Sequence, residues 1–451
     1  MDKSSFPYLI PITRNIFAPV LKNPETLVAE QLKTMPSPPA GSQIAIAVGS
    51  RGIDNLVPVL KAILDWLHAS GAKPFVIAAM GSHGGGTVEG QLSVLESYGV
   101  RADALGVPVV ASIDTISFRG SPYDGDIFIT KEAWEADGII ILNRVKKHTD
   151  IQDSIQSGLC KMIAIGLGNR QQAEILHNEG LDTLSASIPL IASSVIASKK
   201  ILLGVALVEN LRGQTAIAEV IPPESLIQRE KELLKESDAL SVGLPVDTLD
   251  VLVIDEGGKN YAGSCIDTNV IGRMRLEGER DLDTPNIHRV VVCDLSDHSQ
   301  GNAAGIGLAD FITRRFYQKI DFPSTNTNCI SCIFPERGKI PMVMENSGSA
   351  LATALQTCRS SARKEPRIIR IHDTLNLERM YVSSALLDEI SEREEISILG
   401  PPRAMVDTDG ELVPFERWDC FKKSFHPLRM PKQRMPRYLS GVIHKVCYSF
   451  S

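Results

Sequence analysis

Two histidines follow apolar runs that are typical of buried strands. His83 lies between Ser82 and three glycines, after the run of residues 74–79, and His148 lies among polar residues after the run of residues 138–142. The carboxyl ends of parallel strands share one edge of a sheet, where α/β proteins gather their ligands. Either histidine alone is often structural. Together they predict an acid and a base on opposite sides of a substrate.

The three glycines after His83 precede a helical pattern over residues 88–97. Open backbone N–H groups at a helix N-terminus make a good anion site. The consensus of a P-loop or of a GxGxxG fingerprint is absent, so the segment is weak evidence for nucleotide binding. A tight turn remains the alternative interpretation of Gly84, Gly85 and Gly86.

Lys161 and His177 flank a third segment of interest, 16 residues apart. On one continuous helix this spacing means a rise of about 24 Å and faces about 160° apart, so the two side chains could not share a ligand. Gly166 and Gly168 predict a break that lets the chain turn back toward Lys161. A lysine in this apolar setting is expected to have a lowered pKa and to be nucleophilic, with a solvent-reaching surface lysine as the alternative.

Arg51 follows the apolar run of residues 43–48 and predicts a clamp for a carboxylate, because a guanidinium offers a fork of donors. A phosphate or a backbone group is the alternative partner. Glycine-rich polar turns at 255–260, 267–273 and 299–307 predict the opposite wall of a cleft. Cys329 and Cys332 form a single C-x-x-C without a second pair, which we interpret as incidental.

The elements that must position these residues form two α/β series. Strand patterns occur at 43–48, 74–79, 138–142, 201–208 and 215–221, and then at 249–255, 290–295, 340–344 and 368–371. Helical patterns occur at 53–70, 88–97, 224–240, 305–317 and 349–358. This alternation predicts two α/β domains with mostly parallel sheets and the active site in the cleft between them. We expect domains at 1–245 and 246–414, followed by a basic segment at 415–451.

Composition narrows the class of protein. The chain has 451 residues, 43% of them hydrophobic and 22% charged, with a formal charge of -7. These values exclude a small binding module and a mainly disordered chain, and the charge has the wrong sign for a protein that coats nucleic acid. Eight scattered cysteines, no secretory signal and no sufficiently apolar span predict a soluble cytoplasmic protein that binds neither nucleic acid nor membranes. The basic segment predicts a solvated terminus, with an anion-binding arm as the alternative.

The ordered motifs extend over most of the chain. They are Arg51, Ser82-His83-Gly84-Gly85, Lys147-His148-Thr149-Asp150, Ser157-Gly158-Leu159-Cys160-Lys161-Met162, Ile165-Gly166-Leu167-Gly168, His177, Asp267-x-Asn269 and Gly301-Asn302-Ala303. This set resembles the nickel-dependent lactate racemase family, and it is similar to a broader homologue rather than to lactate racemase itself. The spacing from Lys161 to His177, together with the two upstream histidines, is the most specific element.

The resemblance implies a nickel-pincer nucleotide, which is a pyridinium mononucleotide that holds nickel through one carbon and two sulfurs. Lys161 would attach it as a thioamide, His177 would give nickel a nitrogen ligand, and Ser82 with the three glycines would contact the cofactor. His83 and His148 would be the acid/base pair, and Arg51 would hold the substrate carboxylate. The implied reaction is racemisation or epimerisation of a 2-hydroxy acid by hydride transfer through a 2-keto acid.

The chain departs from the lactate racemase pattern in several places. Gly52 follows Arg51 where that pattern has a proline, and Gly272, Arg273 and Arg275 occupy the region where it has a glutamine and a lysine. A different or larger 2-hydroxy acid is therefore expected, with Arg273 or Arg275 as a second substrate clamp. Two other functions stay open. One is a zinc-type hydrolase or lyase that uses His83, His148 and His177 as ligands, and the other is a non-catalytic carrier of a nucleotide or metal cofactor.

Overall fold

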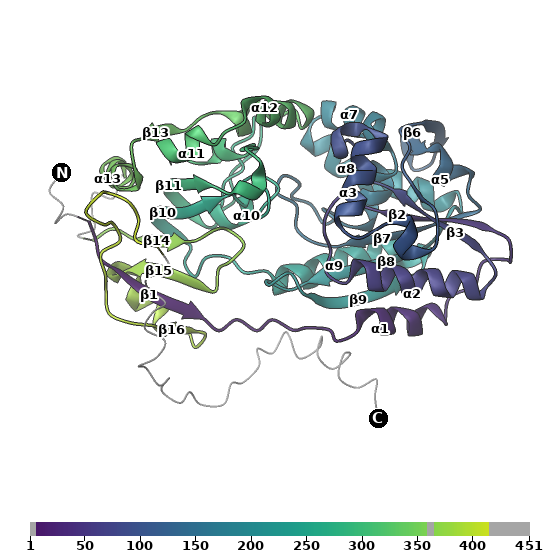
Figure 1. Ribbon diagram of the computed structural model, residues 1–451, viewed down its shortest axis with the longest axis horizontal. Helices are drawn as coiled ribbons and strands as arrows, with labels where there is room; N and C mark the ends of the chain where they lie inside the picture. The colour runs from purple at the N-terminus through teal and green to yellow at the C-terminus, as the bar shows by residue number, and fades with distance from the viewer. Residues whose placement is uncertain (1–5, 359–364, 415–451) are drawn as a thin grey trace. The chain divides into compact units, whose positions relative to one another are not determined.

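The computed structural model of the protein describes residues 6–358 and 365–414 (Figure 1). The contacts between residues divide the chain into two units, Met1–Leu412 and Val413–Ser451. The basic segment predicted at 415–451 lies outside the described residues. In the described part of the chain, no helix combines the length and the apolar character that crossing a membrane requires.

The first half of the chain builds a six-stranded sheet in the order β4-β3-β2-β7-β8-β9. All neighbouring strands in it are parallel except β8 and β9. The strands are β2 (Gln43–Val48), β3 (Lys73–Ala78), β4 (Val109–Val110), β7 (Gly138–Arg144), β8 (Ile201–Glu209) and β9 (Thr215–Ile221). A separate hairpin pairs β5 (Thr115–Gly120) with β6 (Tyr123–Thr130).

Both faces of this sheet are covered, as the alternation along β2 shows. Ile44 and Ile46 belong to one buried cluster, together with residues of α1 (Pro24–Leu32) and α2 (Leu56–Ala69). Ala45 and Ala47 belong to a second cluster on the opposite face. Successive side chains of a strand point to opposite faces, so an uninterrupted apolar run is what a doubly covered parallel strand requires.

The second half builds an eight-stranded sheet in the order β13-β12-β11-β10-β14-β15-β1-β16. Its strands from β13 to β14 are parallel, and β15, β1 and β16 are antiparallel. They are β1 (Leu9–Arg14), β10 (Thr248–Gly257), β11 (Asn286–Leu295), β12 (Phe311–Thr313), β13 (Met342–Met344), β14 (Ile368–Ile371), β15 (Arg379–Ser383) and β16 (Ile396–Ile398). Strand β1 therefore joins the sheet of the second half, although it belongs to the first residues of the chain.

The remaining helices connect these strands and cover the sheets. They are α3 (Val88–Ser97), α4 (Ala102–Leu105), α5 (Lys131–Glu135), α6 (Leu159–Lys161), α7 (Asn169–Asn178), α8 (Leu181–Ala197), α9 (Leu226–Leu240), α10 (Thr268–Ile271), α11 (Arg314–Gln318), α12 (Phe322–Ser331), α13 (Ser347–Thr357) and α14 (Leu387–Ile390). The predicted class of two α/β domains with mostly parallel sheets is confirmed. The division at residue 245 stays a prediction.

The helix predicted over 305–317 is wrong. The segment contains the strand β12, whose Phe311 and Ile312 are buried and pair with both β11 and β13. Helical structure begins again only at Arg314. Pairing with two strands buries the apolar pair more completely than a surface helix would, and the local pattern of residues does not contain this information.

Candidate functional site

Three of the predicted site residues lie on loops after three neighbouring strands. Arg51 follows β2, His83 follows β3 and His148 follows β7, and the sheet order places β2 between β3 and β7. The chain thus continues from β2 to β3 on one side of β2 and reaches β7 on the other. This is a topological switch point, where open α/β sheets bind their ligands.

The His83 imidazole is oriented by Ser50, whose hydroxyl is hydrogen-bonded to Nδ1. The Ser50 carbonyl in turn accepts a hydrogen bond from the Tyr98 hydroxyl at 3.1 Å. The side chain is exposed, yet the protein around it displaces water, and Arg51 and Lys161 repel a positive charge. Both effects lower the pKa of His83, so the imidazole is neutral at pH 7.

The glycine turn after His83 is tightly packed. Gly84 has a φ of 66°, and a Cβ there would lie 2.6 Å from the backbone nitrogen of Gln91 in α3. Thr87 caps this helix, because its hydroxyl accepts a hydrogen bond from the Gly90 N–H at 3.1 Å. Close packing therefore explains Gly84, and contact of Ser82 and the three glycines with a cofactor stays a prediction.

We expect Gly84→Ala to lower the free energy of unfolding by about 3 kcal/mol, since it adds a collision to the strain of a left-handed backbone. Gly85→Ala is the matched control. Gly85 has a φ of 68° with open space around it, so a loss of about 1 kcal/mol is expected there. Thermal unfolding of the two variants measures the difference, and equal midpoints would contradict the packing role.

His148 is held at both ring nitrogens. Its Nδ1 accepts hydrogen bonds from the backbone N–H groups of Asp150 and Ile151 at 3.0 and 3.2 Å. Its Nε2 lies 2.5 Å from the Nζ of Lys161. The backbone N–H of His148 donates to the Gln156 side chain at 2.7 Å. Burial, followed by repulsion from Lys161, lowers the pKa of His148 well below its ordinary value.

Lys161 lies at the end of α6, and a π-helical turn, Met162–Gly166, follows it directly. The Gly166 carbonyl accepts from the Gly81 N–H at 3.2 Å. A Cβ at Gly166 would lie 2.6 Å from the Ala79 carbonyl oxygen, so only glycine lets this turn approach the end of β3. The close approach joins the segment of Lys161 to the loop of His83.

The predicted break between Lys161 and His177 is present at Asn169, which has a φ of 52° and begins α7. The Asn169 side chain is buried and donates to the Ser112 carbonyl and the Thr130 hydroxyl, at 2.7 and 2.8 Å. Beyond the break, burial and then the charge of Lys161 lower the pKa of His177. Within the described residues the half-buried imidazole of His177 has no hydrogen-bond partner.

A buried glutamate of α9 binds the backbone of α6. Glu230 of α9 is 1% exposed, and its Oε2 accepts from the Cys160 N–H at 2.8 Å. Burial raises the pKa of Glu230 from 4.5 to about 7. The folded protein therefore retains a proton that the unfolded chain releases at lower pH, and stability falls as the pH rises through the window from 4.5 to 7.

Glu230→Gln keeps an oxygen that can accept from Cys160 and removes the ionisation. We expect the variant to be more stable than the parent protein at pH 8 by about 3 kcal/mol, and nearly equal to it at pH 5. Thermal unfolding at the two pH values tests this. A difference that does not change with pH would show that Glu230 does not ionise in this range.

The second half of the chain contributes to the same site. The Thr268 hydroxyl donates to the Thr149 carbonyl at 2.7 Å, and the Asn269 side chain donates to the His148 carbonyl at 3.3 Å. Arg337, 5% exposed, forms an ion pair with Asp150 at 2.9 Å. The loop of His148 is thus held by residues more than a hundred positions away.

Positive charges gather around Arg51. Burial and the charge of Arg51 both lower the pKa values of three lysines. The pKa is about 8 for Lys146 and for Lys161, and the pKa of Lys259 is also lowered. In the part of the chain that the structure describes, the side chains of Arg51 and Lys146 make no hydrogen bond or ion pair, whereas Lys259 donates to the Gly263 carbonyl at 2.6 Å. Unpaired cations in one place favour an anionic ligand.

Arg273 does not lie among these cations. It is 3% exposed, pairs with Asp310 at 2.8 Å and donates to the carbonyls of Leu308 and Ile287. These contacts occupy the guanidinium, so we assign Arg273 a structural role in place of the predicted substrate contact. Arg275 is half-exposed and lies 3.7 Å from the same Asp310. No contact in the described ranges joins it to the site.

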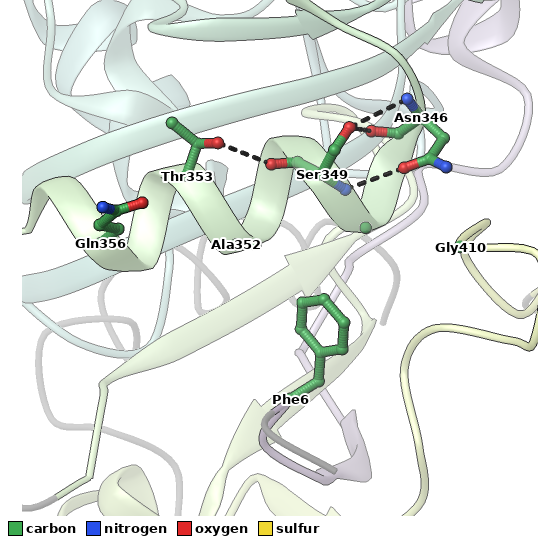
Figure 2. A pocket seen from close by; sticks show the side chains of 8 residues that line it. Phe6, Asn346, Ser349, Ala352, Thr353, Gln356 and Gly410 are labelled. Atoms are coloured by element: carbon green, nitrogen blue, oxygen red, sulfur yellow. Dashed lines mark hydrogen bonds between the residues drawn. The ribbon is translucent and has the colours of Figure 1, made fainter. Parts of the chain in front are cut away.

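A separate hollow lies along α13 (Figure 2). It is lined by Phe6, Asn346, Gly348, Ser349, Ala352, Thr353, Gln356 and Gly410. Asn346 and Ser349 form a capping box, in which Ser349 N–H donates to the Asn346 side chain at 2.9 Å and Asn346 N–H to the Ser349 hydroxyl at 3.1 Å. None of the predicted site residues lines this hollow.

Sequence reasoning missed the supporting residues of the site. Ser50 stood next to Arg51, and its place after a strand could have drawn attention to it. Lys259 belonged to a turn that the sequence already marked as polar and rich in glycine. Glu230 and Arg337 carried no local signal, since each acts on a residue that is distant in the sequence.

The arrangement does not resemble a zinc centre. Over residues 6–358 and 365–414, no group of three or more His, Cys, Asp or Glu side chains converges as a metal site of that kind requires. The charge of Lys161 acts on His83, His148 and His177 alike, but the three imidazoles do not form such a set. The hypothesis of a zinc-type hydrolase or lyase therefore has no support in the geometry of the described residues.

Comparison with known proteins finds a solved structure with a similar fold. Neither a protein-family model nor a curated protein matches the sequence. Among solved structures, the chain is similar to the lactate racemase apoprotein from Thermoanaerobacterium thermosaccharolyticum, with a TM-score of 0.50 and 13% identity over 81% of this chain and 98% of that one. A protein from Thermotoga maritima is similar with a TM-score of 0.46 and 13% identity, over 73% and 89% of the two chains. The protein thus has a fold like that of the lactate racemase apoprotein.

Proposed function

We propose that this protein is a racemase or epimerase of a 2-hydroxy acid that carries a nickel-pincer nucleotide on Lys161. The observation that carries the proposal is the placement of the Lys161 amine 2.5 Å from the His148 imidazole, beside Arg51, His83 and His177. The similarity of fold to a lactate racemase apoprotein supports the same reaction class.

The residues present fit the proposed cofactor. Lys161 offers an amine for attachment, and His177 offers an imidazole that no described residue engages. Two sulfurs and a carbon from the cofactor, together with one imidazole, form a soft ligand set that suits nickel. The unpaired cations Arg51 and Lys146 suit the negative charges of a mononucleotide phosphate and a substrate carboxylate. When bound, the group would supply an acceptor for hydride.

The two histidines start from different states. The Ser50 hydroxyl can donate to His83 Nδ1 or accept from it, so His83 can take up the hydroxyl proton of a substrate at Nε2. His148 accepts two backbone hydrogen bonds at Nδ1 and presents a proton at Nε2. His148 must release those two bonds before its Nε2 can act as a base. Arg51, at the end of β2, would orient the carboxylate between them.

Protein produced in a host that synthesises the nickel-pincer nucleotide tests the proposal. We expect an adduct of nucleotide mass on the peptide that contains Lys161, near-stoichiometric nickel, and interconversion of the enantiomers of at least one 2-hydroxy acid, measured by chiral chromatography. An unmodified Lys161 without nickel, in a host where a lactate racemase is loaded normally, would refute the proposed cofactor. A loaded protein that converts no 2-hydroxy acid would favour a carrier.

Substitution of Arg51 tests the substrate carboxylate. Loss of two charge-assisted hydrogen bonds in Arg51→Ala is expected to raise KM by about 100-fold and to change kcat less. Arg51→Lys keeps the charge without the fork, so a rise of about tenfold is expected. Arg101→Ala is the control, because Arg101 is exposed and pairs with Asp103. An unchanged KM in Arg51→Ala would remove Arg51 from the binding of substrate.

A further inference from the structure

The hydrogen bonds of His148 determine which of its nitrogens carries a proton. Backbone N–H groups only donate, and those of Asp150 and Ile151 both point at Nδ1. Nδ1 must therefore accept, which requires its lone pair. A neutral imidazole carries one N–H, so the proton of His148 lies on Nε2.

The proton on Nε2 points at Lys161, whose Nζ lies 2.5 Å away. An ammonium group has three donors and no acceptor, so a protonated Lys161 would set a donor against a donor. An amine has a lone pair and can accept. The two backbone hydrogen bonds on one side of the ring thus select the unprotonated form of the lysine on its other side.

The surroundings of Lys161 act in the same direction. Asp150 favours the ammonium form, but it is paired with Arg337. Burial opposes that form most strongly, and the charges of Arg51 and Lys146 add to the effect, so that the pKa of Lys161 is lowered to about 8. The charged and titratable groups that face Lys161 are Arg51, Lys146, Asp150, Cys332, His83, His148 and His177.

We infer that Lys161 of the unmodified protein gives up its ammonium proton far more readily than an exposed lysine, that His148 favours the resulting amine, and that the site acylates itself from activated acyl or thioacyl donors. In the step, the hydrogen bond from His148 Nε2–H to Nζ breaks, and the freed Nζ lone pair forms a C–N bond to the acyl carbon. The bond from that carbon to the leaving group breaks, the leaving group takes the bonding electrons, and one amine proton passes to water. This step does not depend on the proposed function. Only the claim that a thiocarboxyl group of the cofactor is such a donor rests on the proposed function.

Acetylation of the unloaded protein by p-nitrophenyl acetate tests the amine. This ester is uncharged, so the cations of the site do not concentrate it. Peptide mapping at a series of pH values gives the acetylation rate of each lysine, and Lys61, which is exposed on α2, is the internal reference. We expect a midpoint near pH 8 for Lys161 and, at pH 7.5, a rate about 100-fold above that of Lys61. A midpoint above pH 10 would overturn the inference.

The role of His148 has its own readouts. In His148→Ala nothing opposes protonation from the imidazole side, and we expect acetylation of Lys161 at pH 7.5 to slow by about tenfold, the effect of one lost hydrogen bond. Nitrogen NMR of the intact unloaded protein does not depend on that variant folding. It is expected to show His148 with its proton on Nε2 at pH 7, and a proton on Nδ1 would overturn the inference.

Neither measurement uses nickel, cofactor or a hydroxy acid, so the inference and the proposed function can fail separately. A Lys161 that titrates near pH 8 in a protein that never takes the cofactor would refute the proposed function alone. A protein that takes up the cofactor, but whose Lys161 before loading has an acetylation midpoint above pH 10, would refute this inference alone.

Discussion

Replacement of His83 or His148 by alanine is expected to lower the racemisation rate of the loaded protein by about 10²–10⁴-fold each, the usual contribution of a positioned acid or base. The reason is geometric. Each imidazole lies after a central strand of the six-stranded sheet, and each is fixed by its own partner, Ser50 for His83 and two backbone N–H groups for His148. Steady-state rates by chiral chromatography give the measurement.

His68→Ala is the control for these variants. His68 is an exposed histidine in α2 that lies outside the loops of the site, so no change in rate is expected. Nickel content and the mass of the Lys161 peptide should stay near parental levels in His83→Ala, which separates lost chemistry from lost cofactor. Full activity in both the His83 and the His148 variants would refute the acid/base assignment.

Lys161→Arg is expected to abolish the adduct, the bound nickel and the activity together. A guanidinium stays protonated at any usable pH and is no nucleophile, although it keeps the positive charge. The loss should therefore be complete, in contrast to the partial loss in an acid/base variant. Intact mass and metal analysis of the purified protein give the result without a substrate.

Lys147→Arg is the matched control for that variant. Lys147 lies next to His148, but its ammonium pairs with Asp238 at 2.5 Å, and an arginine can keep this ion pair. The adduct and the nickel should be unchanged in it. An adduct that persists in Lys161→Arg would place the attachment on another residue, and the proposed role of Lys161 would be lost.

Arg337 and Asp150 illustrate how the supporting contacts restrict the site. Asp150 stands two residues after His148, and its N–H holds the ring while its carboxylate binds Arg337 from the second half of the chain. The same residue thus orients an imidazole through its backbone and joins the two halves through its side chain. Any rearrangement of this contact would move the loop that faces Lys161.

The sequence by itself determined the elements with uniform local patterns. The apolar runs at 43–48 and 138–142 became β2 and β7, because a strand covered on both faces must be apolar at every position. The polar residues directly after these runs pointed to Arg51 and His148, since parallel strands end at one sheet edge. The helix break near Gly168 also followed from local chemistry.

Only the tertiary structure decided the contacts between distant residues. Strand β1 pairs with β15, about 370 residues away, and residues 311–313 form a strand within an expected helix. Glu230 reaches Cys160 across 70 positions, and the proton on His148 follows from where the chain turns after β7. A local pattern shows which side chains are apolar and at what spacing they recur, and this predicts which of them are buried. The partner that buries it, or that satisfies its hydrogen bond, is set by the packing of the whole chain.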